Sequence, residues 1–203
     1  MTVVGARIVE ELRGVQCLPL EQCPPQKKSI TCSRSFGILT DSLDDLREAV
    51  TLYMTRAAER LRRFHLSAGV VTIFIMTNRF SEDPQYSNSV TFDLAYSTDV
   101  TSELLEWGLR GLDQIFREGF RYKKAGVMLS HLVPSDQQSK RLFGDTGYER
   151  SRRLMEVVDQ INKRYGRDTV RFGVQHPDAR WRTKFLRRSS RYTTRLNEVL
   201  RLA

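Results

Sequence analysis

The sequence has few of the residues from which metal and nucleophile sites are built. Its 203 residues include only three cysteines and three histidines, each isolated from the others: Cys17, Cys23, Cys32, His65, His131 and His176. A zinc site needs four such ligands, usually in closely spaced pairs, and an odd number of cysteines does not fit a disulfide framework. We therefore expect no metal site and free, buried thiols, as in proteins of a reducing compartment.

Long apolar runs and a secretion signal are also missing. The longest apolar run, residues 69–76, is far shorter than the roughly 20 residues that span a bilayer. The N-terminus lacks the charged, apolar and small-residue blocks of a signal peptide. We expect a cytoplasmic protein without membrane contact.

Carboxylates are scarce where a catalytic centre would need them. Two-metal phosphoryl transfer requires several acids that converge from strand ends or loops, but the predicted strands contain only Asp93. No P-loop, GxSxG motif or dinucleotide glycine pattern occurs. The sequence thus assigns neither a catalytic residue nor a cofactor to this chain.

Positive charge is abundant and unevenly distributed. The chain has 33 basic and 24 acidic residues, a net charge of +9 and a pI near 9.8, which suggests a polyanionic partner. Residues 150–203 contain 13 arginines and 2 lysines against 5 acidic residues, so this quarter of the chain carries the whole excess. The charge of such a tail by itself suggests nonspecific DNA binding or simple solvation.

Hydrophobic periodicity predicts an α+β domain in the middle of the chain. A short helix at 3–13 ends at Gly14, and a proline-containing connector follows it through residue 26. Alternating residues then predict strands at 27–35, 70–77, 89–96 and 122–133, the first ending at Phe36-Gly37. Apolar stripes predict helices at 41–63 and 101–118, the first capped by Ser42, the second capped by Thr101 or Ser102 and ended by Gly119. The order β-α-β-β-α-β predicts a four-stranded sheet with both helices on one face.

A small mixed basic extension follows this domain. Residues 134–150 are polar and are predicted to be a linker. A helix at 152–165, an extended piece at 169–173 and an arginine-rich tail follow, with too few apolar residues to indicate a core of their own.

One face of the predicted sheet has the chemistry of a phosphate-binding surface. Small hydroxyl residues alternate along the first strand, at Ser29, Thr31, Ser33 and Ser35. Thr72 or Thr77 and a close backbone approach at Gly126 extend this face. Counted with their flanking residues, as segments 27–36, 69–79, 86–96 and 121–131, the strands also carry seven basic residues against one acid, so we expect positive charge on this face.

Two alternatives to phosphate binding follow from the same pattern. Antiparallel sheets often expose a polar face to water without binding anything. An RNA-binding module of this element order would need aromatic residues on the open face, whereas Phe92 falls on the apolar side. Arg34 lies on the same side of its strand as Cys32, which is expected to be buried. Because an unpaired arginine should not be buried, Arg34 is expected either to be turned outward by a bulge or to lie at the sheet edge.

Four segments resemble one known family in order and spacing. They are ELRGVQC (11–17), ITCSRSFG (30–37), RYKKAGVML (121–129) and RYTTR (191–195). Together they resemble the C-terminal part of UmuC-type Y-family DNA polymerases over essentially the whole chain. The resemblance implies an error-prone translesion polymerase of the SOS response, whose palm, fingers and Mg²⁺-binding carboxylates precede this region, so that this chain alone is inactive.

The resemblance also implies domain bounds and a DNA-binding set. Residues 1–26 are expected to be the end of the thumb helix and a tether, 27–133 the little-finger DNA-binding domain, 134–150 a linker and 151–203 the UmuC-specific extension. The little finger would hold the primer-template backbone. The residues expected to contact DNA are Lys27, Lys28, Ser33, Arg34, Ser35, Lys123 and Lys124.

Protein partners are implied in the same way. Gln138, Leu142 and Phe143 resemble a peptide that binds the sliding clamp. The family suggests UmuD′ and RecA filaments as partners of the extension. The remaining alternative for the whole chain is a stand-alone basic RNA-binding module.

Overall fold

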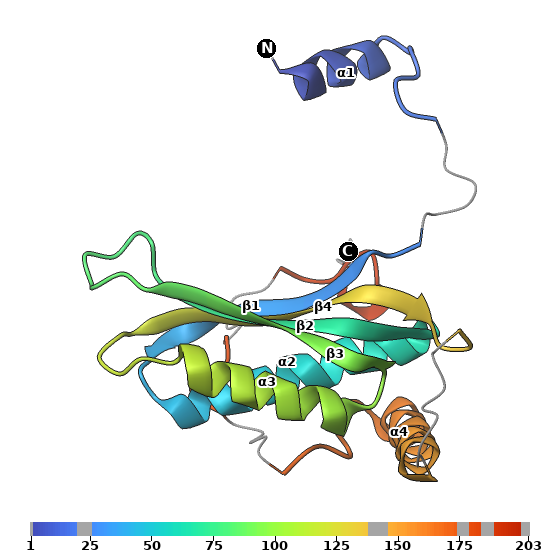
Figure 1. Cartoon of the computed structure of the whole chain (residues 1–203). Helices are drawn as coiled ribbons and strands as arrows, with labels where there is room; N and C mark the ends of the chain where they lie inside the picture. The colour runs from blue at the N-terminus through green and yellow to red at the C-terminus, as the bar shows by residue number, and fades with distance from the viewer. Residues whose placement is uncertain (1, 20–25, 138–145, 174–178, 184–188, 200–203) are drawn as a thin grey trace.

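The structure, a computed structural model, describes residues 2–19, 26–137, 146–173, 179–183 and 189–199 (Figure 1). Its elements are α1 (Val3–Leu12), β1 (Ser29–Thr40), α2 (Leu43–Arg63), β2 (Leu66–Thr77), β3 (Ser87–Thr98), α3 (Thr101–Ile115), β4 (Tyr122–Pro134), α4 (Thr146–Tyr165) and the 3₁₀ turn η1 (Leu196–Glu198). This order confirms the predicted α+β class and the β-α-β-β-α-β arrangement of the central domain.

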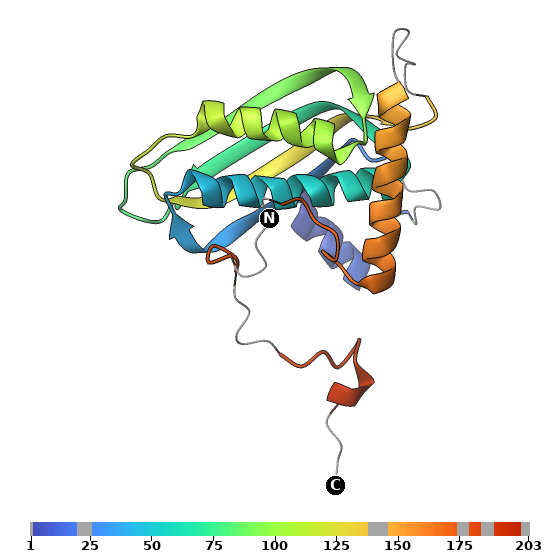
Figure 2. The same cartoon turned by 90° about the horizontal axis from the view of Figure 1, so that it is seen from below.

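The four strands form one sheet in the order β1-β4-β2-β3, and all neighbours are antiparallel. β1 and β2 therefore run parallel with β4 between them, as in a split β-α-β unit. Helices α2 and α3 lie side by side on one face of the sheet, and no helix of the described residues packs on the other face (Figures 1 and 2). Both edge strands, β1 and β3, border this open surface.

Helix α2 forms as its local sequence predicts. The Ser42 side chain caps it by accepting a hydrogen bond from the Asp45 amide at 3.3 Å. Acidic residues fill its first turn and arginines its last turn, which suits the helix dipole. The predicted apolar stripe is buried against the sheet at Leu46, Val50, Tyr53, Ala57 and Leu61.

Three predicted boundaries are wrong, two of them because tertiary contacts override local signals. β1 does not end at Phe36-Gly37 but continues to Thr40 through a register irregularity after Ser35. Phe36 is buried in the core, so the strand has a reason to continue. At the start of α3 the N-cap is Val100, because the Thr101 hydroxyl accepts a hydrogen bond from Arg62 and does not cap the helix. The helix ends at Ile115, and Gly119 lies in the following turn at φ +85°.

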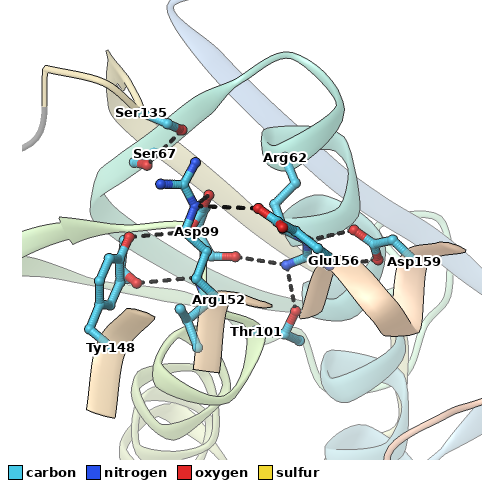
Figure 3. A network of polar contacts seen from close by, with 11 residues as sticks. Arg62, Ser67, Asp99, Thr101, Ser135, Tyr148, Arg152, Glu156 and Asp159 are labelled. Atoms are coloured by element: carbon cyan, nitrogen blue, oxygen red, sulfur yellow. Dashed lines mark hydrogen bonds and ion pairs between the residues drawn. The ribbon is translucent and has the colours of Figure 1, made fainter. Parts of the chain in front are cut away.

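Helix α4 is longer than predicted and is attached to the domain by a polar network. It begins at Thr146, so the last residues of the predicted 134–150 linker are helical. Arg62 of α2 donates two hydrogen bonds to the Asp159 carboxylate of α4, at 2.6 and 2.9 Å (Figure 3). The same guanidinium donates to the Asp99 carbonyl at 2.7 Å and to Thr101 at 2.9 Å. Arg62 thus joins three elements.

Asp99 forms the second half of this network. Its carboxylate is buried, accepts a hydrogen bond from the Tyr148 hydroxyl at 3.2 Å and lies 3.5 Å from Arg152 (Figure 3). Burial raises the pKa of Asp99, and Arg152 and Tyr148 oppose that shift. Two α4 side chains therefore stabilise a charge that the domain buries.

The C-terminal extension also contributes a residue to the core. Trp181 is only 3% exposed and packs edge-on against Phe36 and Tyr53, at centroid distances of 5.5 and 6.1 Å. Its indole N–H donates to the Glu48 carboxylate at 3.1 Å, and its carbonyl accepts from the Gly37 amide at 2.9 Å. The extension is therefore packed onto the domain, although its composition predicted little core.

No helix among the described residues is long and apolar enough to cross a membrane. Within the same residues, no group of three or more histidine, cysteine, aspartate or glutamate side chains is arranged to hold a metal ion.

Candidate nucleic-acid interface

The strand register defines the surface opposite α2 and α3, which we call the open face. Its residues come from all four strands and are mostly hydroxyl, small or apolar, with one lysine and one aspartate. They are Ser29, Thr31, Ser33 and Ser35 of β1; Lys124, Gly126, Met128 and Ser130 of β4; Val70, Thr72, Phe74 and Met76 of β2; Ser87, Ser89, Thr91 and Asp93 of β3. The serine and threonine row of β1 lies on this face, as its alternation predicted. Thr72 belongs to it, whereas Thr77 is buried.

At the centre of the open face, the space beside Gly126 that was expected to admit a phosphate is filled by an aromatic ring. Phe74 lies over Gly126, and a Cβ added at Gly126 would lie 2.3 Å from the Phe74 ring and 2.4 Å from the Ser33 Cβ. The glycine therefore makes room for an aromatic ring of the neighbouring strand and not for a phosphate. Lys124 extends toward the same ring, with its Nζ 5.9 Å from the centroid.

Sequence reasoning missed Phe74, although its signal was present. In the segment VVTIFIMT, Phe74 shares strand parity with Thr72 and Met76, and so it belongs to the open side. Phe92, by contrast, packs against Trp107 of α3 at a centroid distance of 5.3 Å, as predicted for the apolar side. The open face thus carries one aromatic ring, half-buried on the sheet.

Alanine at Gly126 tests this packing. The added methyl group would overlap Phe74 and Ser33, so we expect Gly126→Ala to lower the free energy of unfolding by about 1–3 kcal/mol. Urea denaturation measures the change. Gly147→Ala on α4 is the control, since that position is open and alanine favours helix. If Phe74→Ala fails to relieve the cost of Gly126→Ala in the double variant, the two residues are not in conflict.

The predicted DNA-contacting residues do not form one cluster. Ser33, Ser35 and Lys124 share the open face, and Ser35 pairs directly with Lys124 in the register. Arg34 pairs regularly with Ala125 and points to the helix side. It is exposed because β1 is an edge strand, so the edge position is the correct alternative and the bulge is not.

The other predicted lysines lie at the borders of the sheet. Lys27 stacks on the Phe64 ring at 4.2 Å, and Lys28 is exposed just before β1. Lys123 donates a hydrogen bond to the Phe36 carbonyl at 2.8 Å.

The expected concentration of strand cations on the open face is therefore wrong. Arg121 is also occupied, since it pairs with Asp83, and its hydrogen bond lowers the pKa of that carboxyl.

The predicted clamp-binding residues Gln138, Leu142 and Phe143 lie outside the described residues.

Electrostatics divide the open face into two halves. The β1-β4 half combines a row of hydroxyl groups with Lys124, whereas the β3 edge presents the exposed Asp93. An anionic backbone is attracted to the first half and repelled by the second. Hydroxyl groups and a lysine suit phosphate oxygens, which position a nucleic acid without reading its bases.

Comparison with known proteins gives two matched regions. Residues 27–142 match the impB/mucB/samB family C-terminal domain, and residues 152–202 match a domain of unknown function (DUF4113). Protein UmuC of Salmonella typhimurium is 39% identical over 98% of this chain and 48% of its own length. ImpB of Salmonella typhimurium is 36% identical over 98% and 47%, and MucB of Escherichia coli is 37% identical over 95% and 46%. The chain spans about half the length of these relatives.

Proposed function

The chain belongs to the impB/mucB/samB family, and from this membership we propose that it is the non-catalytic, DNA-holding part of a translesion DNA polymerase of the UmuC type. Its task is to grip the primer-template backbone during cytoplasmic repair synthesis in the SOS response. Nucleotide transfer and its Mg²⁺ belong to the half of such a protein that lies outside this chain.

The observation that supports DNA holding is the β1-β4 half of the open face. Ser33, Ser35 and Lys124 present two hydroxyl groups and one ammonium group on adjacent strands. Each can bind a phosphate oxygen, and neighbouring side chains on one face are separated by about 7 Å along a strand. Because these contacts reach the backbone and not the base edges, the grip tolerates any sequence and damaged bases.

Removing the Lys124 charge tests the proposal. We expect Lys124→Ala to weaken binding to a primer-template by about eightfold at 0.1 M salt. One phosphate contact changes the affinity by about this factor between 1 M and 0.1 M salt, because it releases a bound counterion. The slope of log K against log salt should become shallower by about 0.9. Fluorescence anisotropy over a salt series measures both values.

Lys123→Ala is the matched control for that measurement. Lys123 is the adjacent lysine, but its ammonium group is bonded to the Phe36 carbonyl. The Lys123→Ala variant should therefore leave the slope of log K against log salt nearly unchanged. Equal slopes for the wild type and Lys124→Ala would contradict the assignment of Lys124. Tighter binding to single-stranded RNA than to primer-template would instead favour the RNA-binding alternative.

Docking to other proteins is the second part of the proposed function. We propose that the segment with Gln138, Leu142 and Phe143 binds the sliding clamp, and that the basic extension contacts UmuD′ and RecA filaments. The sequence patterns and family membership support these partners. Trp181 and α4 hold the beginning of this extension against the domain, so docking there would place a partner beside the DNA-binding sheet.

A further inference from the structure

A small cavity lies on the helix side of the β1 edge, away from the open face. Its walls come from β1, α2 and residues 181–183, and they include Arg34, Tyr53, Arg56 and Arg182. The cavity volume is about 130 Å³. That is the liquid volume of about four water molecules, comparable to a group of five non-hydrogen atoms.

Arginines outnumber carboxylates around this cavity. Arg34, Arg56 and Arg182 all act electrostatically on the Tyr53 hydroxyl, and Arg60 and Arg167 join them around the neighbouring Cys32. Two carboxylates in described ion pairs offset them. Asp168 lies 3.6 Å from Arg56, and the buried Glu48 lies 3.7 Å from Arg182. Three guanidinium groups line the cavity and two carboxylates pair with them, which leaves one positive charge in excess that an anion would neutralise.

Two buried donors in this region also lack an acceptor. In the part of the chain that the structure describes, the Tyr53 hydroxyl and the Arg56 Nε are buried without a hydrogen-bond partner. Burial also raises the pKa of Tyr53, so the phenol keeps its proton at neutral pH and remains a donor. Buried polar groups are nearly always satisfied, so an unpaired phenol beside three arginines indicates a missing acceptor.

We propose that this cavity binds a phosphate group. A phosphate has several acceptor oxygens and negative charge, which matches a phenol donor and planar guanidinium donors. The phosphate could belong to DNA that passes the β1 edge or to a small phosphorylated molecule or free phosphate. Ser35 borders both this cavity and the open face, but the basic and phenolic groups of the cavity come from Arg34, Tyr53, Arg56 and Arg182, none of which lies on the open face.

Thermal unfolding of the full chain tests the site with inorganic phosphate as the probe. Phosphate should raise the Tm above its value in sodium chloride of equal ionic strength. Arg34→Gln and Tyr53→Phe should lose this phosphate-specific rise. Tyr53→Phe should unfold at the same or a higher temperature in chloride, because it removes an unsatisfied hydroxyl, so its lost response would not reflect misfolding.

Two control variants separate this site from other basic surfaces. Arg110→Gln on α3 removes an exposed arginine that pairs with Glu106, and it should keep the full response to phosphate. Lys124→Ala should keep it too, even though it weakens DNA binding. A wild-type chain without a phosphate-specific rise, or an equal rise in Arg34→Gln and Tyr53→Phe, would overturn the proposal.

DNA titrations then distinguish the two sources of the phosphate. If the group belongs to the DNA backbone, Arg34→Gln should reduce the salt slope for duplex binding by about 0.9. If the ligand is free phosphate or a small phosphorylated molecule, the slope should stay unchanged while the thermal response is lost. Either result supports a phosphate site.

Discussion

Replacing Trp181 with alanine will lower the free energy of unfolding by about 3–5 kcal/mol, the usual cost of removing a buried tryptophan. The side chain fills the space between Phe36 and Tyr53, and its loss would leave a cavity between β1 and α2. It would also remove the indole donor of Glu48, whose carboxylate is buried. The loss of this hydrogen bond at a buried carboxylate adds to the cost of the cavity.

Urea denaturation followed by circular dichroism measures this change. Trp181→Phe separates packing from hydrogen bonding, since phenylalanine keeps most of the apolar volume but lacks the N–H group that donates to Glu48. It should lie between the wild type and Trp181→Ala. Tyr192→Ala in the exposed part of the extension should change stability by less than about 0.5 kcal/mol. A loss below about 1 kcal/mol in Trp181→Ala would show that the extension does not pack onto the domain.

Replacing Arg62 with alanine will lower the free energy of unfolding by about 1.5–3 kcal/mol, because a buried guanidinium loses its hydrogen bonds to the partly buried Asp159 carboxylate. Arg62 is 8% exposed and donates hydrogen bonds to Asp159, Thr101 and the Asp99 carbonyl. Without the guanidinium, the Asp159 carboxylate faces α2 without a counter-charge. We expect α4 to detach from the end of α2 before the sheet unfolds.

A double-mutant cycle separates the ion pair from the rest of the network. Asp159→Ala in the Arg62→Ala background should cost far less than in the wild type, which gives a coupling energy of about 0.5–3 kcal/mol. Arg153→Ala is the matched control on α4, because this arginine and its partner Glu149 are both exposed. Such a pair contributes at most about 1 kcal/mol. Additive effects of Arg62→Ala and Asp159→Ala would contradict the ion pair as the attachment of α4.

Local patterns predicted the elements whose determinants are close in the sequence. The Ser42 cap and the apolar stripe of α2 lie within one helix, and the alternation of Ser33 and Ser35 with Cys32 lies within one strand. These features appear in the structure as expected. The α3 cap was predicted wrongly, because the Thr101 hydroxyl accepts a hydrogen bond from Arg62, which belongs to another helix.

The remaining features depend on contacts between distant segments. Trp181 and Glu48 are 133 residues apart, so no local pattern connects the extension to the core. The place of Arg34 required the strand order, which makes β1 an edge. The role of Gly126 required the register with β2, because the ring that covers it belongs to Phe74. Pattern alone therefore predicted a hydroxyl-lined face but not how the charges are arranged around it.

Chemical-shift mapping of the backbone amides during titration with a short DNA duplex tests the DNA-binding face most directly. We predict the largest changes in the β1-β4 half of the open face, at Ser33, Ser35, Lys124 and their neighbours, with smaller changes along α2 and α3. Changes confined to α2 and α3, or to residues 189–199 alone, would contradict the assignment of DNA binding to the open face.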